Sequence, residues 1–102
     1  MPKQRSISWR PSAREDLADI VDRISEDSPQ AAENVFNAIE KSVELLPRFP
    51  LLFRESDRMP GMRQIPVFGS FLVFYRVQKE VIEVVGVAHS RRKFPIKHWE
   101  NR

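Results

Sequence analysis

A chain of 102 residues with 41% hydrophobic and 30% charged residues has the composition of one globular domain. It contains no cysteine, which excludes disulfides, thiolate metal sites and cysteine nucleophiles and is consistent with a reducing cytosol. No stretch approaches the ~18 apolar residues of a membrane span, and the N-terminal residues are not followed by the apolar run of a secretory signal. We therefore expect a single cytoplasmic domain over residues 1–102.

The net charge of +3 is distributed unevenly along the chain. Residues 1–50 contain seven Lys/Arg and nine Asp/Glu, whereas residues 51–102 contain ten Lys/Arg and five Asp/Glu. A basic half favours an acidic partner, either nucleic acid or an acidic protein segment. A solvated surface with a chance asymmetry explains the same counts, so charge alone does not choose a partner.

The first third of the chain has the pattern of a short strand followed by a helix. Residues 7–9 alternate in polarity and predict a first strand, which Pro11 ends. Apolar residues then recur at helical spacing over about residues 12–26. Ser12 and Glu15 have the form of a capping box, in which each side chain bonds a free backbone N–H of the first turn.

A second helix is predicted to start at Ser28, whose hydroxyl can cap it, with Pro29 at the first helical position. Its apolar stripe continues to Leu46, and Pro47 and Pro50 end it. Because the link between the two helices is very short, we expect them to pack as an antiparallel pair.

The second half has the pattern of strands after an ordered loop over residues 50–61. Pro66 cannot donate to a ladder, so the strand that contains it is expected at a sheet edge or a bulge. Gly69-Ser70 has the form of a two-residue hairpin loop. Two helices on one face of this small sheet make an α+β fold. We predict three antiparallel strands, at residues 63–68, 71–77 and 81–88.

The last two predicted strands are apolar at nearly every position, which indicates burial on both faces. Two helices cover only one face, so we expect the other face to need a partner, which the basic second half suggests is acidic and amphipathic. Phe94 and Trp99 lie in a basic tail, residues 89–102. They suit base stacking or a tail folded back on the core, and we favour the second interpretation.

Six segments in chain order carry a resemblance to a known family: Pro11-Ser12-Ala13-Arg14-Glu15-Asp16-Leu17-Ala18-Asp19-Ile20, Ser28-Pro29-Gln30-Ala31-Ala32, Leu46-Pro47-Arg48-Phe49-Pro50, Arg63, Phe71-Leu72-Val73-Phe74-Tyr75-Arg76-Val77 and Val87-Ala88-His89-Ser90-Arg91-Arg92. With these residues the chain resembles the ParE/RelE toxin superfamily of type II toxin–antitoxin systems over about residues 7–93. The resemblance implies a cognate antitoxin whose C-terminal segment wraps and neutralises the toxin. It also implies one of two targets, DNA gyrase for ParE-like members or ribosome-bound mRNA for RelE-like members.

Metal-free RNA cleavage needs a base, an acid and cations that hold the charged phosphorane. On the resemblance, Arg63, Arg76 and His89 match family positions on successive strands. An imidazole can serve as the acid, and Glu55 can serve as a base. Each residue also has an ordinary structural role, because the arginines can pair with neighbouring acids and the histidine can be satisfied at a strand end.

The ending His89-Ser90-Arg91-Arg92 resembles that of the ParE branch. RelE-like nucleases, by contrast, combine a tyrosine or histidine near the C-terminus with lysines before the position of Arg63. No tyrosine follows His89, Tyr75 lies in a strand expected to be buried, and no lysine cluster precedes Arg63. We therefore expect gyrase poisoning, with mRNA cleavage as the alternative and a non-toxic interaction protein as a third possibility. No cofactor or metal is expected, because the sequence has no glycine-rich phosphate loop and no metal-ligand spacing. The residues expected to bind target or antitoxin are Arg63, Arg76, His89, Arg91, Arg92 and Lys93.

Overall fold

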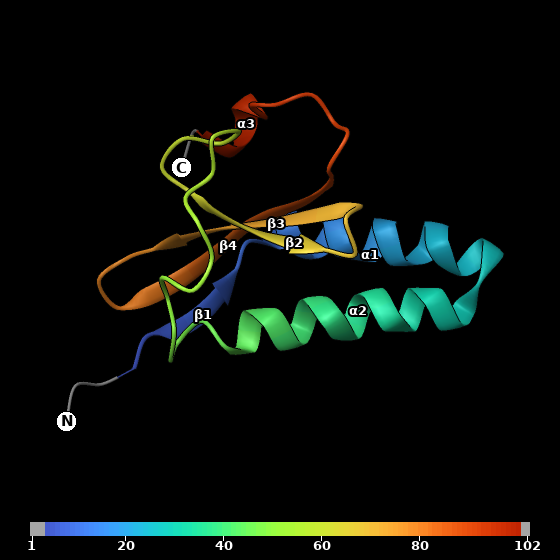
Figure 1. Cartoon of the computed structure of the whole chain (residues 1–102), viewed down its shortest axis with the longest axis horizontal. Helices are drawn as coiled ribbons and strands as arrows, with labels where there is room; N and C mark the ends of the chain where they lie inside the picture. Colours follow the sequence, from blue (N-terminus) through green and yellow to red (C-terminus); the bar gives the residue numbers. More distant parts are fainter. Residues whose placement is uncertain (1–3, 101–102) are drawn as a thin grey trace.

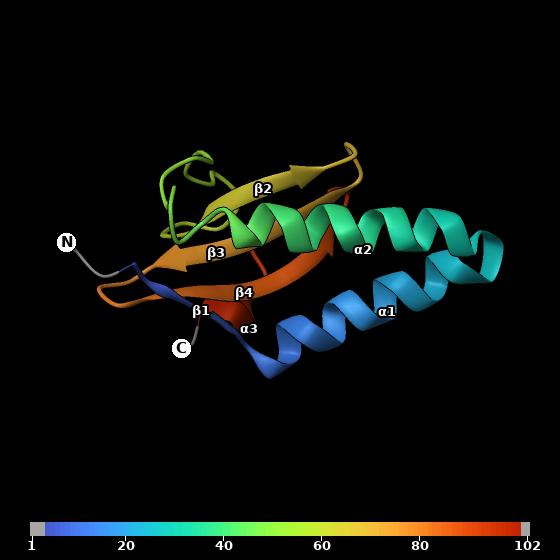
Figure 2. The same ribbon diagram turned by 90° about the horizontal axis from the view of Figure 1, so that it is seen from below.

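The computed structural model describes residues 4–100, so residues 1–3 and the last two residues of the predicted tail, 101–102, lie outside the described part. A four-stranded sheet in the order β1-β4-β3-β2 carries the helix pair α1 and α2 on one face and the short α3 on the other (Figures 1 and 2). The predicted α+β class is confirmed. The elements are β1 (Ser6–Trp9), α1 (Pro11–Asp27), α2 (Pro29–Glu44), β2 (Arg63–Val67), β3 (Phe71–Val77), β4 (Val81–His89) and α3 (Lys97–Glu100).

The start of α1 differs from the prediction. The helix begins at Pro11 with Arg10 as the N-cap and no side-chain capping bond, so the capping box predicted at Ser12 is wrong. Proline suits the first helical position because its ring presets φ and its missing N–H leaves no donor to satisfy. The Arg10 side chain turns away from the helix, where its Nε donates to Glu83 Oε2 at 2.9 Å and its Nη1 to the Trp99 carbonyl at 3.0 Å.

The junction between the two long helices is as predicted. Ser28 ends α1 by donating its N–H to the Ile24 carbonyl at 2.9 Å, and its Oγ accepts the Ala31 N–H at 3.1 Å to start α2. Pro29 occupies the first position of α2. One residue thus terminates one helix and caps the next, and the two helices run side by side in opposite directions (Figure 2).

The sheet is mixed. β2, β3 and β4 form the predicted antiparallel meander, and β1 joins the free side of β4 in parallel, with Trp9 beside Val84. The connection between β1 and its parallel neighbour β4 is long, because the helix pair, β2 and β3 all lie between them in the chain. β2 is an edge strand, as Pro66 indicated. The predicted two-residue loop is wrong, because Val67 pairs with Phe71 and leaves three residues, 68–70, in the turn.

The face away from the helices is covered by the chain itself, so the predicted open apolar face is wrong. We call it the outer face. Trp99 is 1% exposed and lies over Gly86, where any Cβ would collide with its indole ring. The interpretation that Phe94 and Trp99 fold back on the core is confirmed. The buried residues of the outer face are Met59, Met62, Leu72, Phe74, Val85, Ala88, Ile96 and Trp99.

Candidate functional site

The most exposed basic side chains of the predicted set gather where β4 ends. His89, Arg91, Arg92 and Lys93 are all exposed to solvent. His89 organises the turn that follows it, since its Nδ1 accepts the Arg91 N–H at 3.1 Å and its carbonyl accepts the Arg92 N–H at 3.0 Å. Its ring packs edge-on against Phe71, with centroids 5.4 Å apart. His89 therefore has structural contacts that explain its position without a catalytic role.

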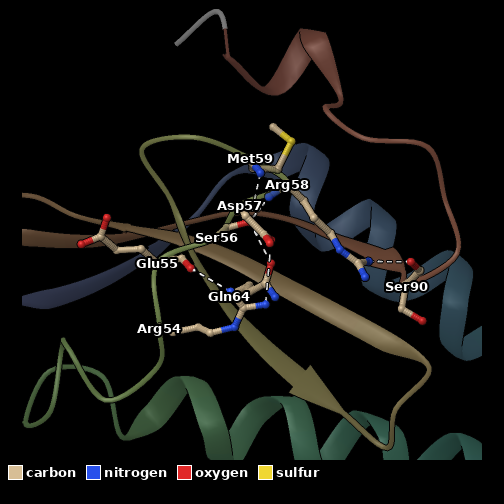
Figure 3. A network of polar contacts seen from close by, with 8 residues as sticks. All are labelled: Arg54, Glu55, Ser56, Asp57, Arg58, Met59, Gln64 and Ser90. Carbon is tan, nitrogen blue, oxygen red and sulfur yellow. Dashed lines mark hydrogen bonds and ion pairs between the residues drawn. The ribbon is translucent and has the colours of Figure 1, made fainter.

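A fifth basic residue, which sequence reasoning missed, completes this group. The Nη1 of Arg58 donates to the Ser90 carbonyl at 2.6 Å (Figure 3), and its guanidinium lies 5.5 Å from the centroid of the Phe94 ring. Arg58 belongs to the loop over residues 50–61, and no periodic pattern predicted that the loop reaches the end of β4. Together these side chains form what we call the strand-end basic cluster: Arg58, His89, Arg91, Arg92 and Lys93.

The loop that carries Arg58 is held by one buried serine. The Ser56 hydroxyl donates to Gln64 Oε1 at 2.7 Å and accepts the N–H groups of Arg58 and Met59 at 3.0 and 2.9 Å (Figure 3). The Met59 sulfur in turn accepts the Ile96 N–H at 3.1 Å. The loop and the tail are thereby fixed to each other, which sets the position of Arg58 beside the end of β4.

Arg63 and Arg76 lie away from this cluster. Arg63 pairs with Tyr75 of β3, whereas His89 pairs with Phe71 of the same strand. Tyr75 and Phe71 are four residues apart, which is about 13 Å along the strand. Its Nη1 donates to the Phe53 carbonyl at 2.8 Å, and its Nη2 lies 3.8 Å from the exposed carboxylate of Glu55. These contacts fasten the preceding loop to β2, in agreement with the structural interpretation of Arg63.

The three residues considered for catalysis also point to different sides of the sheet. Arg63 shares the helix face with Ile65, two residues further along β2, whereas Arg76 shares the outer face with Phe74. Arg76 is half-buried opposite Glu83 in the ladder. The structure therefore does not bring Arg63, Arg76 and His89 together around one reacting phosphate.

Tyr75 is buried, as expected, and its hydroxyl donates to the Pro50 carbonyl at 2.9 Å. Burial raises the pKa of this phenol, more than a nearby backbone hydrogen bond and the Arg63 charge lower it. Both the contact and the shift keep the hydroxyl protonated and engaged in the core. Tyr75 is thus a packing residue in this fold.

A cleft of about 510 Å³ lies between α1 and the end of β4, next to the basic cluster. Asp16 is one of its lining residues, and its Oδ2 accepts the Val87 N–H at 3.2 Å. Burial raises the pKa of this carboxyl, and the Val87 hydrogen bond and the charge of Arg92 oppose the rise. Asp19 and Asp27 of α1 line the cleft together with Asp16.

Within residues 4–100, no three His, Asp or Glu side chains gather in a way that could hold a metal ion. Among the helices of the same range, none combines the length and the apolar character needed to cross a bilayer.

Residues 7–94 match the family described as the ParE toxin of the type II toxin–antitoxin system, parDE. The chain belongs to the ParE toxin family. A solved structure described as the chromosomal ParDE TA system from P. aeruginosa superposes on it with a TM-score of 0.72 and 23% sequence identity, covering 84% of this chain and 96% of that chain. At this identity the likeness confirms the ParE fold. No curated protein matches the chain.

Proposed function

We propose that this ParE-family chain is a toxin that poisons DNA gyrase by binding it, and that the strand-end basic cluster is the surface that binds. One observation carries the proposal. Five exposed basic side chains gather at the end of β4, while Arg63 and Arg76 lie apart from His89, and Arg63 and His89 have structural contacts of their own. This arrangement supports a binding surface over a catalytic centre, because acid–base catalysis needs its groups within hydrogen-bond reach of one substrate.

The covered outer face supports the same choice. A nuclease that used the sheet as its floor would need room for RNA there, but Phe94 and Trp99 pack against Phe74, with ring centroids 5.4 and 5.5 Å from its own. Cleavage of mRNA on the ribosome remains the alternative function. A non-toxic interaction protein is the third.

A toxin with this target acts in the cytoplasm and requires an antitoxin to hold it inactive. The solved relative is described as a ParDE system, which supports a ParD-type antitoxin and a hetero-oligomer for this chain as well. The excess of five basic over acidic residues in positions 51–102 favours an acidic antitoxin segment. The proposal involves no cofactor.

The test is a supercoiling assay with purified gyrase and the purified chain. We expect wild type to inhibit supercoiling and to accumulate cleaved DNA complexes. The variant with Arg91, Arg92 and Lys93 all changed to alanine should lose at least 10-fold in potency, because each side chain is exposed and its loss removes charge without disturbing the core.

The matched control removes the same number of positive charges elsewhere. Lys41, Arg48 and Lys79 are exposed and lie outside the cluster, and their triple alanine variant should keep the potency of wild type. Unaltered supercoiling at an excess of wild-type chain would overturn the proposal. Cuts within codons of ribosome-bound mRNA would then favour the nuclease, and normal growth on strong induction would favour the non-toxic interaction protein.

A further inference from the structure

The turn between β2 and β3 holds an aromatic side chain in a backbone conformation that suits a different residue. Ser70 donates its N–H to the Val67 carbonyl at 3.1 Å, and the two residues between them have positive φ, 52° at Phe68 and 70° at Gly69. Two positive φ values are the pattern of a type I′ turn, in which the first central position favours asparagine. A bulky side chain is uncommon there, because its Cβ lies too close to the backbone. The turn alone therefore does not explain the phenylalanine.

Phe68 gains no packing in return for this strain. Its exposed fraction of 66% is the highest among the exposed large apolar side chains of residues 4–100. Leaving a phenyl ring in water forgoes the free energy that its burial would contribute. Backbone strain that the fold maintains is typical of sites that meet another molecule. Both the conformation and the exposure of Phe68 therefore point to an external contact.

Hydrogen bonds fix this turn beside the strand-end basic cluster. Ser90 donates its N–H to the Ser70 carbonyl at 2.8 Å and its hydroxyl to the Gly69 carbonyl at 3.2 Å. The Ser90 carbonyl in turn accepts from Nη1 of Arg58, a member of the cluster, at 2.6 Å. In Figures 1 and 2 the β2–β3 turn and the end of β4 lie at the same end of the sheet. The ring of Phe68 is thus presented next to five exposed basic side chains.

Two stretches of chain that build this end of the sheet contain no acidic residue. Residues 58–79 have four Lys/Arg and no Asp/Glu, and the same is true of residues 84–99. The aspartates that line the cleft belong to α1. A surface of one sign favours a polyanion. An acidic peptide would pair with the cations, but a nucleic acid strand offers phosphates to the cations and base faces to an exposed ring at once.

We propose that the strand-end basic cluster and Phe68 form a DNA-binding surface, in which the cations contact phosphates and the phenyl ring stacks on an unpaired base. The inference deepens the proposed function and rests on it for the choice of DNA, since gyrase acts on DNA. It adds that the cluster reaches the DNA held by the enzyme as well as the enzyme itself. A ring stacked on a base at a broken strand would oppose its rejoining, which would account for the accumulation of cleaved complexes.

The experiment measures binding of the purified chain to a fluorescein-labelled single-stranded DNA of about 12 nucleotides. Fluorescence anisotropy is recorded from about 50 to about 200 mM salt. The cluster contains four Lys/Arg, namely Arg58, Arg91, Arg92 and Lys93. Each phosphate contact on a single strand contributes about 0.7 to the slope of log Kd against log salt, so we expect a slope of about 3. The variant with Arg91, Arg92 and Lys93 changed to alanine should lower it to about 0.7.

The decisive variant is Phe68→Asn, because its two expected effects have opposite sign. Asparagine suits the positive φ of the turn, so the variant should be at least as stable as wild type in thermal denaturation. It should nevertheless bind the strand about 10-fold more weakly with an unchanged salt slope, since it loses stacking and no charge. Phe68→Trp keeps an aromatic face and should bind at least as tightly as wild type. The matched control is Phe49→Asn, at an exposed phenylalanine outside the cluster, which should bind within twofold of wild type.

The failures of the two proposals differ. If the chain inhibits gyrase but does not bind the DNA strand at the lowest salt concentration, the DNA inference is overturned while the toxin function stands. The inference is also overturned if Phe68→Asn binds DNA within twofold of wild type, or if RNA of the same sequence binds about 10-fold more tightly than the DNA. If the chain binds DNA with the expected pattern and does not inhibit gyrase, the gyrase poisoning fails and the DNA-binding surface stands.

Discussion

On the helix face of the sheet, α1 and α2 provide two long amphipathic elements, whereas on the outer face a loop and a four-residue helix provide the cover. The contacts on the helix face repeat every three to four residues. The contacts on the outer face follow no such repeat. An example is the hydrogen bond from the Ile96 N–H to the Met59 sulfur, which joins residues 37 apart in the sequence. The strands are apolar on both faces because the chain itself covers both, so an apolar strand pattern alone does not indicate an open surface.

The largest expected effect tests whether the buried residues of the outer face contribute as much stability as those of the helix face. Trp99→Ala should destabilise the chain by about 3–5 kcal/mol, because a fully buried indole leaves a cavity over Phe74. Ile39→Ala on the helix face should cost a comparable amount, about 2–5 kcal/mol. Urea denaturation followed by circular dichroism measures both. If Trp99→Ala cost less than 1 kcal/mol, the outer cover would be an accessory and not a core.

A smaller effect tests the close approach between the tail and the sheet. Gly86→Ala should cost about 1–3 kcal/mol, because the added Cβ collides with the Trp99 indole and must displace it. In a Trp99→Ala background the same change should cost almost nothing. The coupling between the two substitutions, measured by the same denaturation method, isolates the contact. Equal costs in both backgrounds would mean that strain within β4, and not the indole, opposes a side chain at Gly86.

The same contrast explains what could be predicted from the sequence. The cap at Ser28, the helix pair and the edge position of Pro66 were predicted correctly because each depends on residues within one or two turns of chain. The placement of β1 beside β4 was not predicted, because the paired residues Trp9 and Val84 are separated in the chain by the helix pair, β2 and β3. Local reasoning also failed at Ser12, where the capping pattern was present but Pro11 occupied the first helical position.

The candidate site divides in the same way. The basic run after His89 was visible in the sequence, because its residues are consecutive. Arg58 was not, since only the bond network around Ser56 and the contact with Ser90 bring its loop to the end of β4. The aspartates that line the cleft, Asp16, Asp19 and Asp27, were visible on and directly after the predicted first helix. The cleft beside them was not predictable, because it depends on β1 pairing only with Val81–Val84 of β4.

The cap of α2 at Ser28 is expected to contribute about 1 kcal/mol to stability. Ser28→Ala should destabilise the chain by about 1 kcal/mol, because it removes the hydroxyl that accepts the Ala31 N–H. Ser12→Ala is the matched control and should change stability by less than ~0.5 kcal/mol, since Ser12 is exposed and does not cap α1. Thermal denaturation of the two variants side by side is sufficient. A larger loss at Ser12 would restore the capping box.

The smallest effect concerns Asp16, which lies where the helix face, β4 and the cleft meet. Burial raises the pKa of its carboxyl above 3.8 in the folded chain, so the folded state binds its proton more tightly than the unfolded state. Its contribution to stability is therefore fully present below pH 3.8 and is lost as the pH rises through the folded pKa. Asp16→Asn has no proton to lose and keeps an oxygen that can accept the Val87 N–H. We therefore expect the variant to gain stability relative to wild type as pH rises over this window, measured as the difference in urea midpoint at matched pH values. A constant difference across the window would show that the carboxyl is solvated well enough to titrate as it does in the unfolded chain.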